Sequence, residues 1–523
     1  MPTLNWRGKD AVLNHHLAVP YHLLRCEPSM SAGEPGSGNL IVEGDNLTAL
    51  KALLPYYKGQ VKCIYIDPPY NTGNEGWVYN DNVNSPEMRG WLGKVVGGEA
   101  EDLSRHDKWL CMMWPRLKLL SEFLHEDGVI FISIDDQEAA SLRIVCDEVF
   151  GKSSFVAQFV WKARQHLDSR AVSGVSTDHE YVLAYSRTKG RALAGKLRDE
   201  DKYANPDGDP RGPWMSRSIL GLASKAQRPN LHYPLVDPAT TLEYPCAENT
   251  GWRYSRDTMA TKVAEGRILF PKKPTGRPRE KVFLTELQTS SPGYPSVIDG
   301  IFTADGTAEI RAIFGRGVFD FPKPSTFVAE LLAQAAGPND LILDSFAGSG
   351  TTAHAVLKLN AEDGGNRRFI LVEMDPTIAQ TITSERVRRL AAGYTNSKGE
   401  AVPGLGGGFR YCRLGAPLFA AHGGLGSAVT REALAHHIYF TETGEPLPHP
   451  VPPTGTFIGA CAGRSFHLLY DAENGVLVTE DVLATLPADQ GHRVVFADAC
   501  LVPEESLREQ NVTFKQIPYA IKG

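Results

Sequence analysis

Residues 61–70 read VKCIYIDPPY, and this stretch decides the fold class. Its first part is a compact apolar run between Gly59 and Pro68, as expected of a buried strand in a parallel sheet. Similar runs recur at 128–135 (GVIFISID) and 341–346 (LILDSF), and segments with helical spacing separate them. The alternation predicts an α/β fold with a parallel sheet.

The four residues DPPY end this strand, at the edge where open α/β sheets bind ligands. An exocyclic base amine is a poor nucleophile because its lone pair is delocalised into the ring. The Asp67 carboxylate and the Pro68 carbonyl are two acceptors for its N–H groups, and Pro69 stiffens the turn further. Tyr70 offers a ring on which an extruded base can stack. We therefore predict a catalytic turn; a purely structural proline-rich turn is the alternative.

A second motif, DSFAGSGTT, covers residues 344–352 between a strand and a helix. Its glycines let the backbone approach a ligand closely, at a usual nucleotide-binding position. No lysine follows the last glycine, as a phosphate-binding P-loop requires, and there is no GxGxxG fingerprint. Glu373, at the end of the next strand, is placed to bind ribose hydroxyls, with Asp375 as its rival.

The net charge of −7 is unevenly distributed. Residues 156–285 hold 22 basic and 14 acidic side chains, a balance of +8, so the rest of the chain carries −15. This asymmetry indicates a segment that faces phosphates, although a solvated basic face is the plainer interpretation. Eight scattered cysteines without a CxxC pair indicate free thiols in a reducing cytoplasm, with neither a metal site nor a disulfide framework. Neither a secretory signal nor a membrane span is expected.

Composition divides the chain into five parts. We expect an N-terminal extension (1–38), the first part of the core (39–155), an inserted domain (156–300), the second part of the core (301–395) and a small α+β C-terminal domain (396–523). Large aromatics of the insert are more typical of a domain core than of a binding surface: Trp161, Trp214, Tyr233 and Trp252.

Together the motifs resemble the amino-methyltransferase family of DNA-modifying enzymes. Their order resembles its permuted β group, with DPPY first, then a target-recognition domain, then FxGxG. Four further stretches are similar to modification (Mod) subunits of type III restriction systems: IYIDPPYNTG (64–73), GDNLTALKALL (44–54), STDHEYVLAYSRTK (176–189) and NVTFKQIPYAIKG (511–523). The resemblance implies a Rossmann-like core on a mixed seven-stranded sheet flanked by helices. It also implies methyl transfer from S-adenosylmethionine to adenine N6 in double-stranded DNA after base flipping, with S-adenosylhomocysteine as product.

The resemblance assigns roles residue by residue. Catalysis falls to Asp67, Pro68, Pro69 and Tyr70. The Lys-Pro element of the family matches FPKPS (321–325), and its acidic turn matches EGDN (43–46). The implied cofactor-binding residues are Asp45, Asn46, Lys323, Pro324, Ser325, Asp344, Phe346, Ala347, Gly348, Ser349, Gly350, Thr351 and Glu373. The expected DNA-contacting residues are Tyr79, Arg164, Arg170, Arg211, Arg217, Lys272, Lys273 and Arg277.

Several alternatives stay open. The loop 74–84, which holds Tyr79, either closes over the flipped base or is an ordinary surface loop. N4-cytosine is the other acceptor that the family uses, more often with Ser in place of Asp67. PCAEN (245–249) superficially matches a C5-cytosine methylase, but it precedes FAGSG and lies within the insert, so we reject it. The chain could instead be chiefly a DNA-recognition subunit of a larger defence complex. Cleavage would need a helicase-nuclease partner, and the resemblance implies a homodimer.

Overall fold

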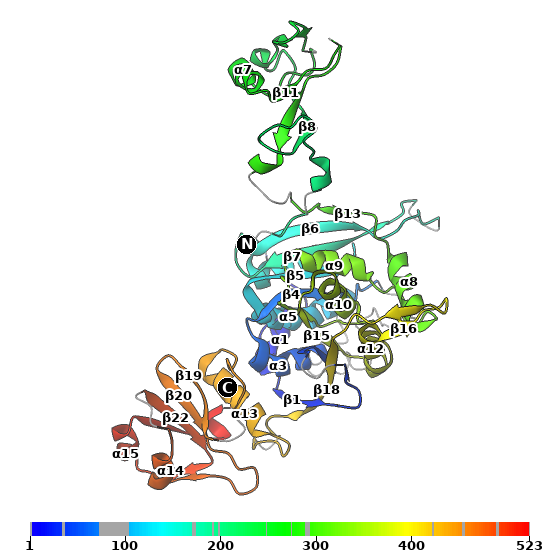
Figure 1. Ribbon diagram of the computed structural model, residues 1–523. Helices are drawn as coiled ribbons and strands as arrows, with labels where there is room; N and C mark the ends of the chain where they lie inside the picture. Colours follow the sequence, from blue (N-terminus) through cyan, green and yellow to red (C-terminus); the bar gives the residue numbers. More distant parts are fainter. Residues whose placement is uncertain are drawn as a thin grey trace. The chain divides into compact units, whose positions relative to one another are not determined.

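The computed structural model describes residues 3–33, 37–72, 104–169, 174–190, 193–196, 199–246, 248–273, 275–287, 293–420, 423–451, 455–487 and 491–521. The chain forms two compact units, unit 1 (Met1–Leu193 with Pro295–Gly523) and unit 2 (Ala194–Tyr294) (Figure 1). Unit 2 spans fewer residues than the insert expected at 156–300. The reason is that residues 155–162 and 179–186 form strands of the unit 1 sheet, where they gain backbone partners.

Unit 1 is built on a sheet that has 11 strands among the described residues, in the order β1-β18-β3-β15-β14-β4-β5-β7-β6-β13, with β2 paired to β18. The central strands are parallel and largely buried: β3 (Leu40–Glu43), β15 (Arg368–Glu373), β14 (Leu341–Asp344), β4 (Val61–Ile66) and β5 (Leu124–Ile134). The flanking strands are β1 (His22–Cys26), β2 (Ala32–Gly33), β6 (Phe155–Lys162), β7 (His179–Ser186), β13 (Val297–Ile298) and β18 (Gly408–Pro417). β7 runs antiparallel to β5 and β6, which confirms a mixed sheet, although a larger one than the expected seven strands.

The two halves of the core meet in the middle of this sheet. β4 and β14 are parallel neighbours, with Ile64 opposite Leu343, although all of unit 2 lies between them in the chain. Strands that run in parallel end at the same edge, so the residues that follow β4 and β14 come together there. This pairing places DPPY beside DSFAGSGTT.

Helices flank the sheet, as expected (Figure 1). Alternate strand residues such as Ile64 and Ile66 join one apolar core with α3, α5 and α6. Pro115 lies inside α5, which continues through it. The α-helices among the described residues up to 392 are α1 (Lys9–Val12), α2 (His15–Ala18), α3 (Asn46–Tyr57), α5 (Arg105–Phe123), α6 (Ala139–Cys146), α7 (Arg256–Ala264), α8 (Thr303–Phe314), α9 (Ser325–Ala333), α10 (Thr351–Asp363), α11 (Pro376–Ile378) and α12 (Ser384–Ala392). Within the described parts of the chain, no helix has the length and apolarity needed to cross a membrane.

Cys26 and Cys412 form a disulfide between β1 and β18, where they lie directly opposite each other. The expectation that all eight cysteines are free thiols is therefore wrong for this pair; the other six are free. The two residues are 386 positions apart in the chain. Strand pairing alone makes them neighbours, and cysteine spacing gives no sign of it.

The chain after β18 forms the expected small α+β part. Its four-stranded sheet has the order β19-β20-β22-β24, and Ile438, Phe466 and Phe496 belong to its core. The boundary expected at 396 lies too early, because β18 still belongs to the main sheet. The described strands and α-helices from 393 onward, other than β18, are β16 (Gly393–Thr395), β17 (Ala401–Pro403), α13 (Arg431–Thr443), β19 (Phe457–Cys461), β20 (Arg464–Leu468), β21 (Leu477–Val478), α14 (Glu480–Ala484), β22 (His492–Ala497), β23 (Ala499–Cys500), α15 (Glu504–Glu509) and β24 (Val512–Gln516).

Unit 2 contains a three-stranded antiparallel sheet in the order β11-β12-β8. Tyr233 and Trp252 are buried in its core, as expected for aromatic residues of the insert. Trp161 is also buried, but it lies on β6 of unit 1. The strands of unit 2 are β8 (Trp214–Ser218), β9 (Leu235–Val236), β10 (Glu243–Tyr244), β11 (Ile268–Leu269) and β12 (Arg279–Phe283).

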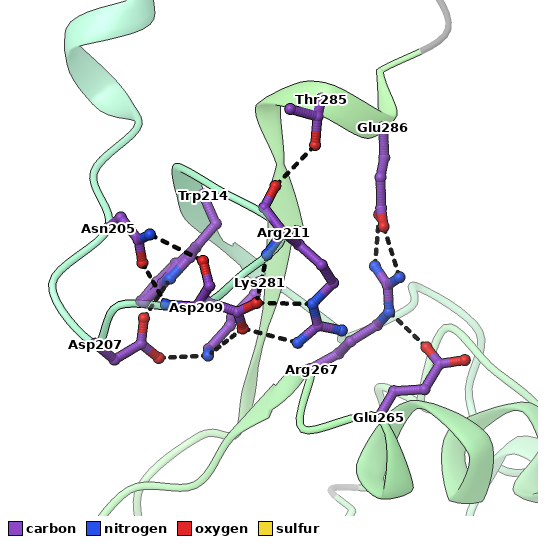
Figure 2. A network of polar contacts seen from close by, with 10 residues as sticks. All are labelled: Asn205, Asp207, Asp209, Arg211, Trp214, Glu265, Arg267, Lys281, Thr285 and Glu286. Atoms are coloured by element: carbon purple, nitrogen blue, oxygen red, sulfur yellow. Dashed lines mark hydrogen bonds and ion pairs between the residues drawn. The ribbon is translucent and has the colours of Figure 1, made fainter.

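A dense polar network holds the sheet of unit 2 to the preceding loop (Figure 2). Lys281 on β12 donates to Asp207 and, at 3.0 Å, to Asp209. Arg211 binds Asp209 through two hydrogen bonds of 2.8 and 2.7 Å, and its guanidinium lies 4.4 Å from the centre of the Phe283 ring. These contacts stabilise a small unit in which polar partners supplement a limited apolar core.

Candidate active site

A cavity of about 130 Å³ lies at the edge where β4 and β14 end. Three stretches line it, within residues 65–70, 319–323 and 344–352. They follow β4, precede α9 and follow β14, respectively. DPPY and DSFAGSGTT, which are far apart in the chain, thus share one site.

Asp67 and Pro68 of the DPPY turn line the cavity. The turn carries two hydrogen-bond acceptors, the Asp67 carboxylate and the Pro68 carbonyl. The indole N–H of Trp109 donates to the Pro69 carbonyl at 2.6 Å and so fixes the turn to α5. Among the residues that the structure describes, none donates a hydrogen bond to the Pro68 carbonyl. The Pro68 carbonyl can therefore accept a donor from a ligand, whereas both carboxylate oxygens of Asp67 lie within hydrogen-bond distance of Lys323.

Lys323 lines the cavity and binds the DPPY turn. Its Nζ lies 3.0 and 2.9 Å from the two carboxylate oxygens of Asp67, and 3.3 Å from Glu180. Burial alone would lower the pKa of Lys323, but the negative charges of Asp67 and Glu180 outweigh it and raise that pKa. Lys323 is therefore a cation at neutral pH. The resemblance assigned Lys323 to the cofactor pocket; that role stays a prediction, and its contacts in the structure include Asp67 and Glu180.

The glycine-rich turn satisfies its own buried carboxyl group. Asp344 accepts hydrogen bonds from the Phe346 amide at 2.9 Å and the Thr352 hydroxyl at 2.5 Å. Burial raises the pKa of Asp344 to about 7. Gly348 has a φ of +51°, and a Cβ at this position would lie 3.2 Å from the ring of Phe319, which lines the cavity. Glycine at 348 therefore keeps this wall of the cavity open.

The cavity sorts the expected cofactor-binding residues into two groups. Its walls include Lys323, Asp344, Phe346, Ala347, Gly348, Ser349 and Thr351. The remaining expected residues are not among the described residues that line it: Asp45, Asn46, Pro324, Ser325, Gly350 and Glu373. Members of the second group instead contact the backbone of the glycine-rich turn or lie at the ends of helices.

Glu373 is buried and binds the backbone of the glycine-rich turn. Its carboxylate accepts hydrogen bonds from the Gly348 amide at 2.8 Å and the Asp375 amide at 2.9 Å. The sequence predicted ribose hydroxyls as the partners of Glu373. That role stays a prediction; these two contacts are with backbone amides.

Asp45 and Asn46 connect α3 and α5 to the same turn. Asp45 caps α3 by accepting from Thr48, and it pairs with the buried guanidinium of Arg116 at 2.8 Å. Asn46 accepts from Arg116 and donates to the Ser345 carbonyl at 3.0 Å. Arg116, which no motif indicated, therefore positions both residues.

Arg386 is a second buried arginine that no motif indicated. Its guanidinium donates at 3.0 Å to the hydroxyls of Ser349 and Thr351 and, also at 3.0 Å, to Glu309. Glu309 in turn accepts from the Ser325 hydroxyl at 2.7 Å. Burial lowers the pKa of Arg386 to about 10, so it stays a cation. The network ties α8, α9 and α12 to the glycine-rich turn.

The expected DNA-contacting residues occur in both units. Arg164 belongs to unit 1 and pairs with Asp168 at 2.7 Å. Arg211 of unit 2 is bound to Asp209, whereas four other residues of that unit are exposed: Arg217, Lys272, Lys273 and Arg277. Arg170, Tyr79 and the rest of the loop 74–84 lie outside the described residues.

A family model and several known proteins are similar to this chain. Residues 61–384 match the family model described as DNA methylase. The StyLTI Mod subunit of a type III restriction-modification enzyme from Salmonella typhimurium is 34% identical over 397 residues, 70% of this chain and 59% of that protein. The EcoPI Mod subunit from Escherichia phage P1 is 32% identical over 428 residues, 72% of this chain and 64% of that one. The type II methyltransferase M.KpnI from Klebsiella pneumoniae is 32% identical over 361 residues, 65% and 81% of the two chains.

The family match spans both motifs of the cavity and everything between them. The chain covers about three fifths of the length of the two Mod subunits, and most of the length of M.KpnI. With a match over more than half of its residues, the chain belongs to the DNA methylase family.

Proposed function

We propose that this chain transfers a methyl group from S-adenosylmethionine to the N6 amine of adenine in double-stranded DNA. The observation that carries the proposal is the pair of acceptors, Asp67 and the Pro68 carbonyl, at a cavity that the glycine-rich turn also lines. Membership of the DNA methylase family and the names of the relatives support the class of reaction.

The residues of the cavity suit S-adenosylmethionine. Gly348 lacks the Cβ that would meet the Phe319 ring, so space remains beside this ring. Phe319 and Phe346 offer apolar surface to an adenine ring. Asp67 and Glu180 together outweigh the charge of Lys323, and the net negative charge attracts a sulfonium. When bound, the cofactor supplies an electrophilic methyl group.

The catalytic turn prepares the target amine for attack. Asp67 and the Pro68 carbonyl accept its two N–H groups, which frees the nitrogen lone pair for in-line attack on the methyl carbon. The new N–C bond forms as the S–C bond breaks, with S-adenosylhomocysteine as the second product, and the methylated nitrogen then loses a proton to water. Tyr70 stacks on the target base, which must leave the duplex at a cost of about a few kcal/mol.

Unit 2 is the proposed target-recognition domain. Its exposed basic side chains would contact phosphates or guanine edges: Arg217, Lys272, Lys273 and Arg277. Tyr79, Arg164 and Arg170 are proposed as further contacts to DNA. Arg211 is a weaker candidate, because its guanidinium is already bound to Asp209.

The chain is further proposed to be the modification component of a type III restriction-modification system in the bacterial cytoplasm. The printed names of two relatives, Mod subunits of type III enzymes, support this assignment. It would act as a homodimer and associate with a helicase-nuclease subunit. Sedimentation of the purified chain tests the dimer, and co-purification with the product of a neighbouring gene tests the partner.

Transfer of labelled methyl to unmethylated duplex DNA, followed by digestion to nucleosides, tests the proposed reaction. Label should appear in N6-methyladenine and vanish in Asp67→Ala. Asp127→Ala is a matched control, because Asp127 is an exposed carboxylate on β5 whose partner is Lys62, and it should retain activity. Label in N4-methylcytosine would overturn the base but keep the mechanism. No label despite cofactor binding would favour a DNA-recognition subunit.

A further inference from the structure

Glu180 is a second carboxylate at the catalytic turn. It lies on β7, opposite Trp161 of β6, and its side chain is 22% exposed. Its Oε2 accepts a hydrogen bond from the Tyr70 hydroxyl at 2.9 Å and lies 3.3 Å from Nζ of Lys323. The target amine has its two acceptors already, so the position of Glu180 needs another explanation.

Asp67 and Glu180 share the same two donors. The Tyr70 hydroxyl lies 2.9 Å from each carboxylate, yet a phenol has one hydrogen and donates it to one acceptor at a time. Nζ of Lys323 lies 2.9 Å from Asp67 and 3.3 Å from Glu180. Both donors can therefore shift toward Glu180 without losing a charged partner.

The ion pair of Asp67 with Lys323 opposes the reaction unless it can be exchanged. Both oxygens of Asp67 face the ammonium, so an entering amine must compete with Lys323 for them. The side chain of Lys323 is only 9% exposed, and a buried ammonium left without a carboxylate is strongly destabilised. Lys323 can leave Asp67 to the amine because Glu180 is a second carboxylate, 3.3 Å from Nζ of Lys323.

Glu180 also sets the charge beside the target nitrogen. The pair of Asp67 and Lys323 alone sums to zero, whereas the addition of Glu180 leaves one net negative charge. The target nitrogen becomes cationic as it gains the methyl group. A fixed negative charge nearby favours that transition state.

We propose that Glu180 is a positioning residue that takes over Lys323 and Tyr70 when the target amine occupies the carboxylate of Asp67. This inference rests on the proposed function, since it requires an exocyclic amine as the group that displaces Lys323. Glu180 acts through Asp67 and is not itself a catalytic residue.

Glu180→Gln tests the exchange, because the amide keeps the shape of the side chain and removes its charge. The full chain, with S-adenosylhomocysteine, is bound to two duplexes that carry adenine or unsubstituted purine at the methylated position. The wild type should prefer adenine by about 10-fold, the scale of one hydrogen bond to a charged group. Glu180→Gln should lose this preference because Lys323 stays on Asp67, and single-turnover methyl transfer should fall roughly 100-fold.

Two further variants separate this role from a merely structural one. Tyr181→Phe changes the next residue of β7, whose hydroxyl contacts His179 at 2.9 Å, and should keep both the preference and the rate. Glu180→Asp keeps the charge and should recover part of the rate. Thermal unfolding of each variant reports any loss of folding. If Glu180→Gln retains the adenine preference, or loses it only because the chain unfolds, the role of Glu180 is overturned.

Failure of the proposed function has a different signature. Methylation of cytosine N4 by the wild type would overturn only the target base. The binding comparison would then use duplexes with cytosine and with its analogue that lacks the amine, in place of adenine and purine. A wild type that transfers no methyl group would overturn the proposed function and the role of Glu180 together. If the wild type transfers methyl and its preference for adenine over purine is unchanged in Glu180→Gln, only the role of Glu180 would be overturned.

Discussion

Two lysines in this molecule have similar surroundings in different units. Lys323 in unit 1 and Lys281 in unit 2 each lie between two carboxylates and near an aromatic ring, at 4.8 and 5.2 Å from the ring centre. The side chains of both lysines are 9% exposed. The partners of Lys323 are Asp67, Glu180 and Tyr70, and those of Lys281 are Asp207, Asp209 and Trp214 (Figure 2).

The two clusters differ in what lies beside them. Lys323 lines a cavity at the carboxyl edge of a parallel sheet, next to the Pro68 carbonyl. Lys281 lies on a small antiparallel sheet, where Arg211 adds two hydrogen bonds to Asp209. A ligand can use an acceptor at the first cluster, whereas the second is satisfied by its own side chains. Position on the sheet, rather than the cluster itself, therefore distinguishes the proposed catalytic site.

Removing one carboxylate from each cluster should give the largest contrast. Asp67→Ala should lower single-turnover methyl transfer roughly 1,000-fold, because the target amine loses one of two preorganised acceptors. Asp209→Ala, measured at saturating DNA, should leave the rate nearly unchanged and lower the thermal midpoint of unfolding, because Asp209 holds Lys281 and Arg211. Similar losses of rate in both variants would mean that the clusters do not differ in role.

Two glycines with positive φ allow a second contrast, in cofactor binding. Gly348 and Gly208 have φ values of +51° and +61°, so valine is strained at either position. At Gly348 the new side chain also meets Phe319, and we expect binding of S-adenosylhomocysteine to weaken by about 100-fold. At Gly208 a Cβ meets no atom within 4 Å, so affinity should stay close to that of the wild type. Calorimetric titration measures both, and wild-type affinity in Gly348→Val would place the cofactor elsewhere.

Basic residues of unit 2 should divide into those that bind DNA and those that hold the fold. Lys272→Ala with Lys273→Ala should weaken DNA binding by about 10-fold and reduce the salt slope by about 1 for each phosphate that is no longer neutralised. Arg211→Ala should leave this slope unchanged and lower the thermal midpoint, because its guanidinium is bound to Asp209. Fluorescence anisotropy over a series of salt concentrations measures the slope. A reduced slope in Arg211→Ala alone would reverse the assignment.

Asp344 and Asp209 should make the free energy of unfolding depend on pH in opposite directions. These effects should be smaller than those of the variants above. Burial raises the pKa of Asp344 to about 7, so the folded chain binds a proton that the unfolded chain releases above about pH 4. Its contribution is fully present below about pH 4 and is lost as pH rises through about 7. Hydrogen bonds from Arg211 lower the pKa of Asp209, so its contribution is present above about pH 4 and is lost on further acidification.

Thermal unfolding of the wild type and Asp344→Asn across this pH range separates the two groups. The variant should lack the fall in midpoint, a few degrees, that the wild type shows between about pH 4 and 7. Loss of stability below about pH 4 should remain in both, because Asp209 is unchanged. An identical fall above about pH 4 in wild type and variant would assign that titration to another group.

The fold class and the meeting of the two motifs were predictable from local patterns. Buried parallel strands are apolar runs, as at 61–67 and 341–346, and their carboxyl ends share one edge. The boundaries of the insert were not predictable, because β6 and β7 lie in the same basic stretch as unit 2. Only their pairing with β5 shows that they belong to the main sheet.

Residues that act through distant contacts also escaped prediction. Glu180 lies within 176–189, a stretch that resembles Mod subunits, but this resemblance assigned it no role. Arg386 lies in an ordinary helix, where no local pattern distinguishes it from an exposed charge. Their roles depend on partners such as Lys323 and Ser349, which the fold alone brings near. For the same reason, the sequence did not predict the disulfide between Cys26 and Cys412.

A structure of the full chain with S-adenosylhomocysteine and a duplex that contains the methylated site tests the central claim most directly. We expect the exocyclic nitrogen of the extruded base within about 3 Å of both the Asp67 carboxylate and the Pro68 carbonyl oxygen. We also expect Lys323 to have moved from Asp67 to Glu180. A target base bound away from the DPPY turn, or one whose amine contacts neither acceptor, would contradict the assignment of this cavity as the site of methyl transfer.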